Sequence, residues 1–271
     1  MYFLLSPAKN LDETCTLPPV VESYLQHAPL ADHQPTLMPQ ACELMALLKP
    51  LDPVELMALL GISHKLAVTN AERNQRWAWA ENRPFTLDHA KPALYLFAGD
   101  VYQGLDANSL SLAAVEYLQR HLGILSGLYG VLKPLDFIMP YRLEMGSKLA
   151  NVRGNNLYEF WGNQIGDTLA KRMAQNGDTV LINLASNEYF KAVKSASLSQ
   201  TVITPRFEDG KNGTYKVISF YAKHARGLMM RYAACHQLKN PEELQNFDLD
   251  GYYFVPEASS KTQFVFRREH D

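Results

Sequence analysis

Short apolar runs alternate along this chain with segments whose apolar residues recur at helical spacing. The runs have the length of buried strands, and we predict strands at residues 2–5, 93–97, 179–184, 202–207, 215–221, 252–255 and 263–268. The helical spacing predicts helices at residues 37–48, 110–122, 156–175 and 221–237. A hairpin turn is expected at 208–213. This order predicts a mixed α/β (α+β) fold, with one domain over residues 1–271, a mixed central sheet and surrounding helices.

Residues 37–80 form a separate helical subregion in this prediction. Asp52 is expected to be the N-cap of one helix, with Pro53 at its first position, and Gly61 to end it. A second helix should begin near Ser63 and run to about residue 79. The apolar positions of 56–67 also match the helix-hairpin-helix motif of DNA-binding proteins, with Ser63 in place of the second glycine of that motif.

Such a turn exposes backbone N–H groups that can bind one phosphate. The candidate DNA contacts here are Gly61, Ser63, Lys65, Arg73 and Arg76. An ordinary helical hairpin, with a glycine C-cap and a serine N-cap, would produce most of the same pattern. The hairpin is therefore the firmer prediction, and its binding of DNA is a hypothesis.

The formal net charge is only −2, but the charges are unevenly distributed. Residues 189–231 contain eight Lys or Arg and only two acidic residues, a local net charge of +6. Basic segments attract phosphate groups regardless of base sequence, and interleaved aromatic residues can stack on bases. A solvated face with core aromatics is the alternative. The candidate DNA contacts from this segment are Lys191, Lys194, Lys223 and Arg226.

Polar residues follow three of the predicted strands or stand in an irregular segment. Residues 125–146 combine Gly and Pro with ionisable groups, which is typical either of a functional loop or of a buried connection with paired charges. Tyr129 and Arg142 from this segment are further candidate DNA contacts. If the strands are neighbours, the polar residues would meet in a cleft suited to acid–base or imine chemistry. The hypothetical catalytic residues are Lys9, Asp100, Tyr102, Glu144 and Lys223.

Composition excludes several classes of protein. The three cysteines, Cys15, Cys42 and Cys235, have no metal-binding or disulfide spacing, and the eight histidines are scattered. We therefore expect no metal site and no cofactor, since nucleotide-cofactor fingerprints are also missing. No run reaches membrane length, and the apolar N-terminal run is too short for a signal peptide. A cytoplasmic protein is expected.

Five blocks of sequence resemble the YaaA family of bacterial peroxide stress resistance proteins. They are residues 6–9, 99–105, 125–146, 183–190 and 220–227. The chain departs from the common pattern at Asn10, Asn187 and His224, and the last change removes one positive charge. The resemblance implies an unusual mixed α/β fold with a helix-hairpin-helix element lining a basic cleft. It also implies DNA binding, DNA protection and lower free intracellular iron.

Three functions stay open at this point. The first is DNA binding in the response to hydrogen peroxide, by backbone contacts without base specificity. The second is an enzyme that acts on damaged nucleobases or nucleotides in DNA, in the manner of a glycosylase or lyase. The third is an iron-binding protein, for which the sequence offers no ligand cluster.

Overall fold

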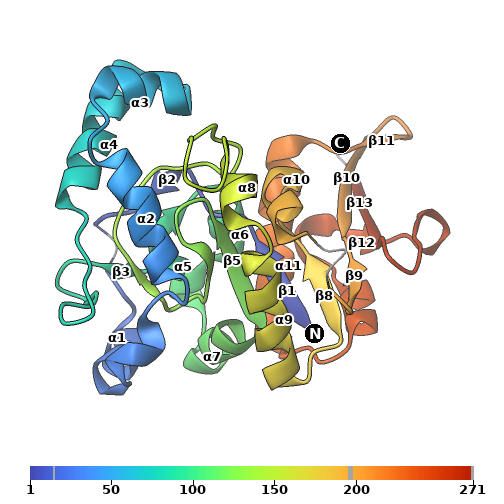
Figure 1. Ribbon diagram of the computed structural model, residues 1–271. Helices are drawn as coiled ribbons and strands as arrows, with labels where there is room; N and C mark the ends of the chain where they lie inside the picture. Colours follow the sequence, from blue (N-terminus) through green and yellow to red (C-terminus); the bar gives the residue numbers. More distant parts are fainter. Residues whose placement is uncertain (15, 195–197, 270–271) are drawn as a thin grey trace.

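The computed structural model describes residues 1–14, 16–194 and 198–269, so Cys15 lies outside the described residues. Its central sheet has the strand order β6-β5-β1-β8-β9 (Figure 1). The strands are β1 (Tyr2–Leu5), β5 (Leu122–Ser126), β6 (Gly130–Leu132), β8 (Val180–Asn183) and β9 (Thr201–Ile203). All neighbouring pairs are parallel except β5 with β6. The predicted strands at 2–5 and 179–184 are confirmed.

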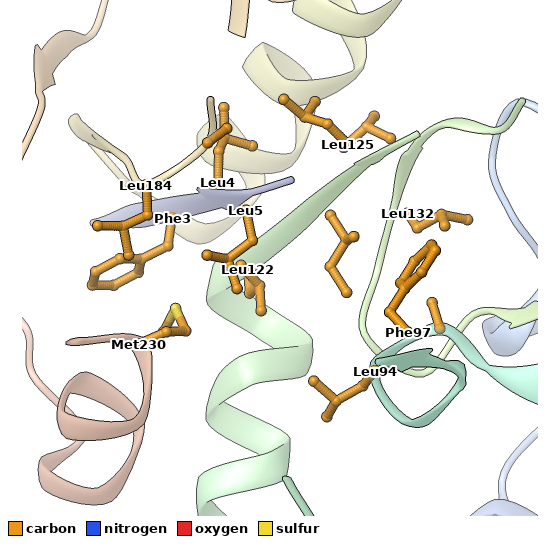
Figure 2. Packing of buried hydrophobic residues seen from close by; sticks show 14 of the residues in the cluster. Phe3, Leu4, Leu5, Leu94, Phe97, Leu122, Leu125, Leu132, Leu184 and Met230 are labelled. Carbon is orange, nitrogen blue, oxygen red and sulfur yellow. The ribbon is translucent and has the colours of Figure 1, made fainter. Parts of the chain in front are cut away.

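The central strands are buried on both faces, as their unbroken apolar runs predict. Every residue of β1 and β5 is buried. Figure 2 shows Met230 beside Phe3 and Leu184, which brings a helix from the C-terminal half against the sheet. This packing removes apolar surface from water on both sides of β1 and makes the sheet the core of the domain.

The order of the strands reverses between β1 and β8. From β1 the chain crosses to β5 on one side, whereas from β8 it crosses to β9 on the other. The connections that leave these two neighbours therefore diverge. A crevice forms at the carboxyl ends of such a strand pair, and in open α/β sheets ligands bind there.

A second sheet has the order β11-β10-β13-β12. Its strands are β10 (Arg206–Lys211), β11 (Thr214–Lys216), β12 (Tyr253–Phe254) and β13 (Val265–Glu269). The predicted hairpin is present between β10 and β11, but its turn is shorter than the predicted 208–213, because Glu208 and Asp209 are buried in β10 and the turn is formed by Asn212 and Gly213. Arginines on the neighbouring strand pair with both carboxylates, so these polar residues can occupy a strand.

The longer helices agree with the sequence pattern. They are α2 (Met38–Leu48), α3 (Pro53–Leu60), α4 (His64–Arg76), α7 (Leu112–His121) and α11 (Ser219–His236), and the structure adds α1 (Pro19–His27). The helix predicted at 156–175 is divided into α8 (Leu157–Trp161) and α9 (Gln164–Asn176), because Gly162 adopts a positive φ of 52°. The strand predicted at 215–221 ends at Lys216, and α11 begins at Ser219.

The strand predicted at 93–97 was also wrong. Residues Ala93–Leu96 form the short helix α5, between β3 (Lys91–Pro92) and β4 (Phe97–Ala98). Short apolar runs are ambiguous between strand and buried helix, and here long-range bonds decide. The Ala93 and Leu94 N–H groups donate to the carbonyl oxygens of Asp136 and Pro134, at 2.9 and 2.8 Å.

The remaining elements are short. They comprise β2 (Asn10–Leu11), β7 (Phe137–Ile138), α6 (Asp100–Leu105), α10 (Asn187–Phe190) and 3-10 turns at Leu30–His33, Ala107–Ser109, Lys191–Val193, Pro241–Asn246, Leu249–Gly251 and Pro256–Ala258. β2 pairs with β4, and β3 pairs with β7. Within residues 1–14, 16–194 and 198–269, no helix is long and apolar enough to span a bilayer.

Candidate functional site

Polar residues from four parts of the chain line one cavity of about 490 Å³ at the carboxyl ends of β1 and β8. It lies at the position where the strand order reverses. Its polar lining residues are Ser6, Lys9, Asn10, Asp100, Tyr102, Ser186, Glu188, Tyr189, Lys223 and Arg226. The structure brings Lys9, Asp100, Tyr102 and Lys223 to one cavity, and their catalytic role stays a prediction. We call this cavity the strand-end pocket.

Hydrogen bonds hold the two sheet loops of the pocket together. The Ser186 N–H donates to Ser6 Oγ at 2.9 Å, and the two serine hydroxyls lie 3.3 Å apart. The Tyr102 hydroxyl donates to the Ser6 carbonyl oxygen at 3.0 Å. Ser6 therefore links the segments after β1 and β8 to α6. Its role was missed in the sequence, because the bonds join residues far apart in the chain.

Burial changes the chemistry of Tyr102. The side chain is almost fully enclosed, and desolvation raises the pKa of its phenol well above the ordinary value. The phenol therefore remains protonated at neutral pH and continues to donate its hydrogen bond. Tyr102 supports the pocket wall rather than supplying a ready base.

Glu144 is next to the strand-end pocket but not in its lining. Its Oε1 pairs with Arg142 Nη2 at 2.9 Å and with Lys9 Nζ at 3.5 Å. The carboxylate therefore connects Arg142 to a lysine whose side chain remains 67% exposed. Of the residues predicted at this site, Glu144 and Arg142 form one charged cluster and Lys9 joins that cluster to the pocket.

Two glycines allow α11, which carries Lys223 and Arg226, to pack closely against α6. A Cβ on Gly227 of α11 would lie 2.7 Å from the Leu105 nitrogen and closer still to the Val101 carbonyl oxygen of α6. A Cβ on Gly104 of α6 would meet the His224 carbonyl oxygen of α11 in the same way. Only residues without a side chain permit this close crossing of the two helices. The crossing brings Lys223 and Arg226 into the lining of the same pocket as Asp100.

Tyr129 cannot reach a ligand in this structure. Its side chain is fully buried, and its hydroxyl accepts a 2.8 Å hydrogen bond from Trp77 Nε1. Burial also raises the pKa of this phenol. At Tyr129 the irregular segment is therefore a buried connection rather than a functional loop. We leave Tyr129 out of the proposed DNA contacts.

The predicted two-helix hairpin is present as α3 and α4. Asp52 and Glu55 form a reciprocal capping box at the start of α3, and Gly61 ends it with a φ of 61°. Ser63 caps α4, where its Oγ accepts a hydrogen bond from the Leu66 N–H. These local features account for the hairpin without any ligand, so its identity as a DNA-binding helix-hairpin-helix stays a prediction.

The cations of the hairpin differ in their surroundings. Lys65 is exposed near the start of α4, whereas Arg73 pairs with Glu13 at 2.5 Å. Arg76 is exposed and joins Arg73 and Lys91 around a second cavity of about 320 Å³. This second cavity shares no lining residue with the strand-end pocket. The hairpin and the pocket are therefore two separate basic regions.

The two acidic residues of the basic segment are occupied by arginines. Glu208 pairs with Arg206 at 2.7 Å and with Arg267 at 2.9 Å, and Asp209 pairs with Arg268 at 2.5 Å. Both acids are buried. In contrast, Lys191, Lys194, Lys211, Lys216 and Lys223 are exposed. The acidic side chains consequently do not screen these surface lysines.

In the described part of the chain, no group of three or more His, Cys, Asp or Glu is arranged to hold a metal ion. Cys42 and Cys235 are both free thiols.

Comparison with known proteins relates the whole chain to one family. The family described as "Peroxide stress protein YaaA" matches residues 1–258. The chain belongs to this family. It is 58% identical over 269 residues to a UPF0246 protein of Psychrobacter cryohalolentis, an alignment that covers 99% of this chain and 98% of the relative. It is 50% identical to a UPF0246 protein of Neisseria meningitidis serogroup B, with the same coverage.

Membership of the YaaA family connects this chain with peroxide stress and leaves its chemistry open. Four of the five blocks that carry the sequence resemblance contribute residues to the strand-end pocket; they are residues 6–9, 99–105, 183–190 and 220–227. The fifth block, residues 125–146, contains Arg142 and Glu144, which reach the pocket through Lys9.

Proposed function

We propose that this YaaA family member binds DNA through its phosphate backbone during the cellular response to hydrogen peroxide, and thereby protects DNA. The proposal includes a cytoplasmic location and contacts that do not depend on base sequence. The family resemblance also implies a lower level of free iron in the cell. We assign no residue of this chain to that effect.

The observation that carries the proposal is the separation of acids from lysines in residues 189–231. Glu208 and Asp209 are buried and paired with arginines, while lysines of the same segment face solvent. A surface of this kind attracts a polyanion through sequence-independent electrostatics. The net charge of the whole chain, which is close to zero, does not reveal this basic surface.

The basic elements lie at one end of the molecule. Figure 1 shows the α3–α4 hairpin on one side of α10 and the β10–β11 hairpin on the other. Lys191 and Lys194 directly follow α10, and Lys211 and Lys216 belong to the β10–β11 hairpin. A duplex lying across α10 would pass from one hairpin to the other. Lys65 would then contact the backbone at one end of this path.

One exposed aromatic residue of the basic segment supports contact with an unpaired base. Phe207 is buried, whereas Phe220 is 54% exposed at the start of α11 and lies beside the exposed Ile218. Aromatic stacking contributes about 1–3 kcal/mol per base in single-strand binding. Phe220 therefore favours DNA with unpaired bases next to the lysines.

The test measures binding of a labelled duplex by fluorescence anisotropy at several salt concentrations. Each lost phosphate contact should reduce the slope of log K against log salt by about 1. We expect Lys65→Glu and Lys216→Glu each to weaken binding by about tenfold at low salt and to reduce the slope in this way. Arg120→Glu is the matched control, because Arg120 is exposed near the amino end of β5.

Unchanged affinity and slope in both lysine variants would refute this binding mode. A loss of the same size in Arg120→Glu would show that only overall charge matters. Phe220→Ala should weaken the binding of single-stranded DNA more than the binding of duplex DNA, since stacking requires an unpaired base.

A second candidate function is an enzyme acting on damaged nucleobases or nucleotides in DNA. It is favoured by one observation, the presence of Lys9, Lys223 and Asp100 in the same pocket. A lysine amine there would attack the sugar aldehyde of an abasic site and form an imine with loss of water. Borohydride reduction would trap that imine as a stable adduct. Adduct formation that survives Lys9→Ala and Lys223→Ala would discard this assignment.

A further inference from the structure

Among the described residues, one partly enclosed arginine differs from the other partly enclosed arginines. The other arginines that are at least partly buried have carboxylate, hydroxyl or carbonyl partners; they are Arg73, Arg142, Arg172, Arg231, Arg267 and Arg268. Arg226 lines the strand-end pocket, and no described residue forms an ion pair or hydrogen bond with its guanidinium. A cation removed from water is costly unless an anion compensates it.

The surroundings of Arg226 strengthen this contrast. Burial lowers the pKa of its guanidinium, because desolvation disfavours the charged form. An arginine nevertheless keeps its charge in proteins. The fold thus maintains a charged group in a partly desolvated place, and the Gly104–Gly227 helix crossing that holds it there leaves little room for the helix to shift.

Two lysines extend the positive wall of the strand-end pocket. Lys223 lies one helical turn before Arg226 on α11, so both side chains lie on the same helix face. It is exposed and has no partner among the described residues. Lys9 enters from the loop after β1. Three cations therefore meet around one cavity.

Two carboxylates in the lining accept hydrogen bonds. Asp100 lines the pocket without a partner among the described residues, and Glu188 uses one oxygen to accept the Gly146 N–H at 2.9 Å. The three cations and the two carboxylates together favour a ligand that combines an anionic group with hydroxyl or amino donors. The cavity of about 490 Å³ has the size of a small-molecule site.

We propose that the strand-end pocket binds one nucleotide unit with a terminal phosphate, which sits on Arg226 and Lys223 while the sugar or base donors face Asp100. The inference deepens the proposed function and rests on it for the nucleotide part of the ligand. A guanidinium binds phosphate oxygens with two parallel hydrogen bonds, which neither Lys9 nor Lys223 can do. The unit is either a free nucleoside monophosphate or the phosphorylated end of a DNA strand.

The direct test is calorimetric titration of the purified full chain with inorganic phosphate, each of the four deoxynucleoside 5′-monophosphates, and the matching nucleosides. We expect at least one monophosphate to bind and its nucleoside to bind at least tenfold more weakly. Arg226→Gln should reduce the monophosphate affinity at least tenfold, with Arg226→Lys between this variant and the wild type. Arg120→Gln, which removes an exposed charge at the other end of the sheet, should bind as the wild type does.

Short single strands with a 5′-phosphate or a 5′-hydroxyl distinguish the two sources. A preference for the phosphorylated strand that disappears in Arg226→Gln identifies a strand end as the ligand. Binding of the free monophosphate without such a preference identifies the free nucleotide. Thermal unfolding of Arg226→Gln checks that the variant is folded, and Lys223→Ala, at an exposed position, gives a second variant with the same expected direction.

The failure of this inference can be distinguished from failure of the proposed function. If no phosphate-bearing probe binds better than its unphosphorylated counterpart while duplex DNA still binds, the nucleotide pocket is refuted and DNA binding stands. If Lys65→Glu weakens duplex binding by about tenfold but leaves monophosphate binding intact, both are supported. If Arg226→Gln binds monophosphates as tightly as the wild type, the pocket assignment is wrong.

Discussion

Substitution of Gly227 by alanine sets two effects against each other. In an ordinary helix this change is stabilising by about 1 kcal/mol, because alanine has the higher helix propensity. At this position the new Cβ would lie 2.7 Å from the Leu105 nitrogen and closer still to the Val101 carbonyl oxygen, inside the 3.0 Å that real Cβ atoms keep. The obstacles are backbone atoms of α6, so no side chain can rotate away.

Overpacking of this kind costs about 1–3 kcal/mol, and we take the upper end because the two backbones must separate. The net expectation is a destabilisation of about 2 kcal/mol, equivalent to a fall of about 5 °C in Tm for a domain of this size. Urea unfolding followed by tryptophan fluorescence and by far-UV circular dichroism measures the free energy of unfolding. The same helices carry Arg226 and Asp100, so phosphate binding should weaken together with stability.

Gly177→Ala is the matched control. Gly177 has a φ of 71°, and no atom lies within 4 Å of the position that a Cβ would take, so only backbone strain of about 1–2 kcal/mol applies there. This control should leave phosphate binding unchanged. A Gly227→Ala protein that is as stable as the wild type, or more stable, would refute the close crossing of α6 and α11.

Two further predictions concern buried polar groups. Tyr129→Phe leaves the Trp77 N–H without its acceptor and should lower the free energy of unfolding by about 1–3 kcal/mol. The affinity of the folded protein for duplex DNA should stay the same. A loss of affinity without a loss of stability would show that Tyr129 belongs to the binding surface. Burial raises the pKa of Asp136 from 3.8 to about 6, so the folded state binds the proton more tightly than the unfolded chain does. This contribution to stability is present below pH 4 and is lost as the pH rises to about 6. The wild type should therefore lose stability relative to Asp136→Asn across that range in urea unfolding, and a constant difference between the two proteins would contradict the cause.

Local signals in the sequence determined the α3–α4 hairpin. The capping box of Asp52 and Glu55, the left-handed Gly61 and the cap at Ser63 all act within three or four residues of the chain. Such contacts form in the same way whatever surrounds them, which is why their boundaries follow from the sequence. The strands at 2–5 and 179–184 were equally clear, because an unbroken apolar run demands burial on both faces.

The structure of residues 93–97 was decided by distant partners. The apolar run fits a strand and a buried helix equally well, and the carbonyl groups of Pro134 and Asp136 select the helix. The burial of Glu208 and Asp209 was decided in the same way, since their arginine partners on β13 are far away in the sequence. A hydrophilic sequence that contains Gly predicts a turn, because the sequence alone does not reveal those partners.

The residue types of the candidate site were evident from the sequence, but their assembly was not. Lys9, Asp100 and Lys223 were recognisable as chemistry-bearing residues after strands or on a helix. Only the strand order placed the ends of β1 and β8 side by side, and only the glycine crossing of α6 and α11 brought Arg226 to the same cavity without a partner. Sequence periodicity reports which face of an element is buried. Which elements become neighbours depends on long-range packing, and that packing formed the pocket.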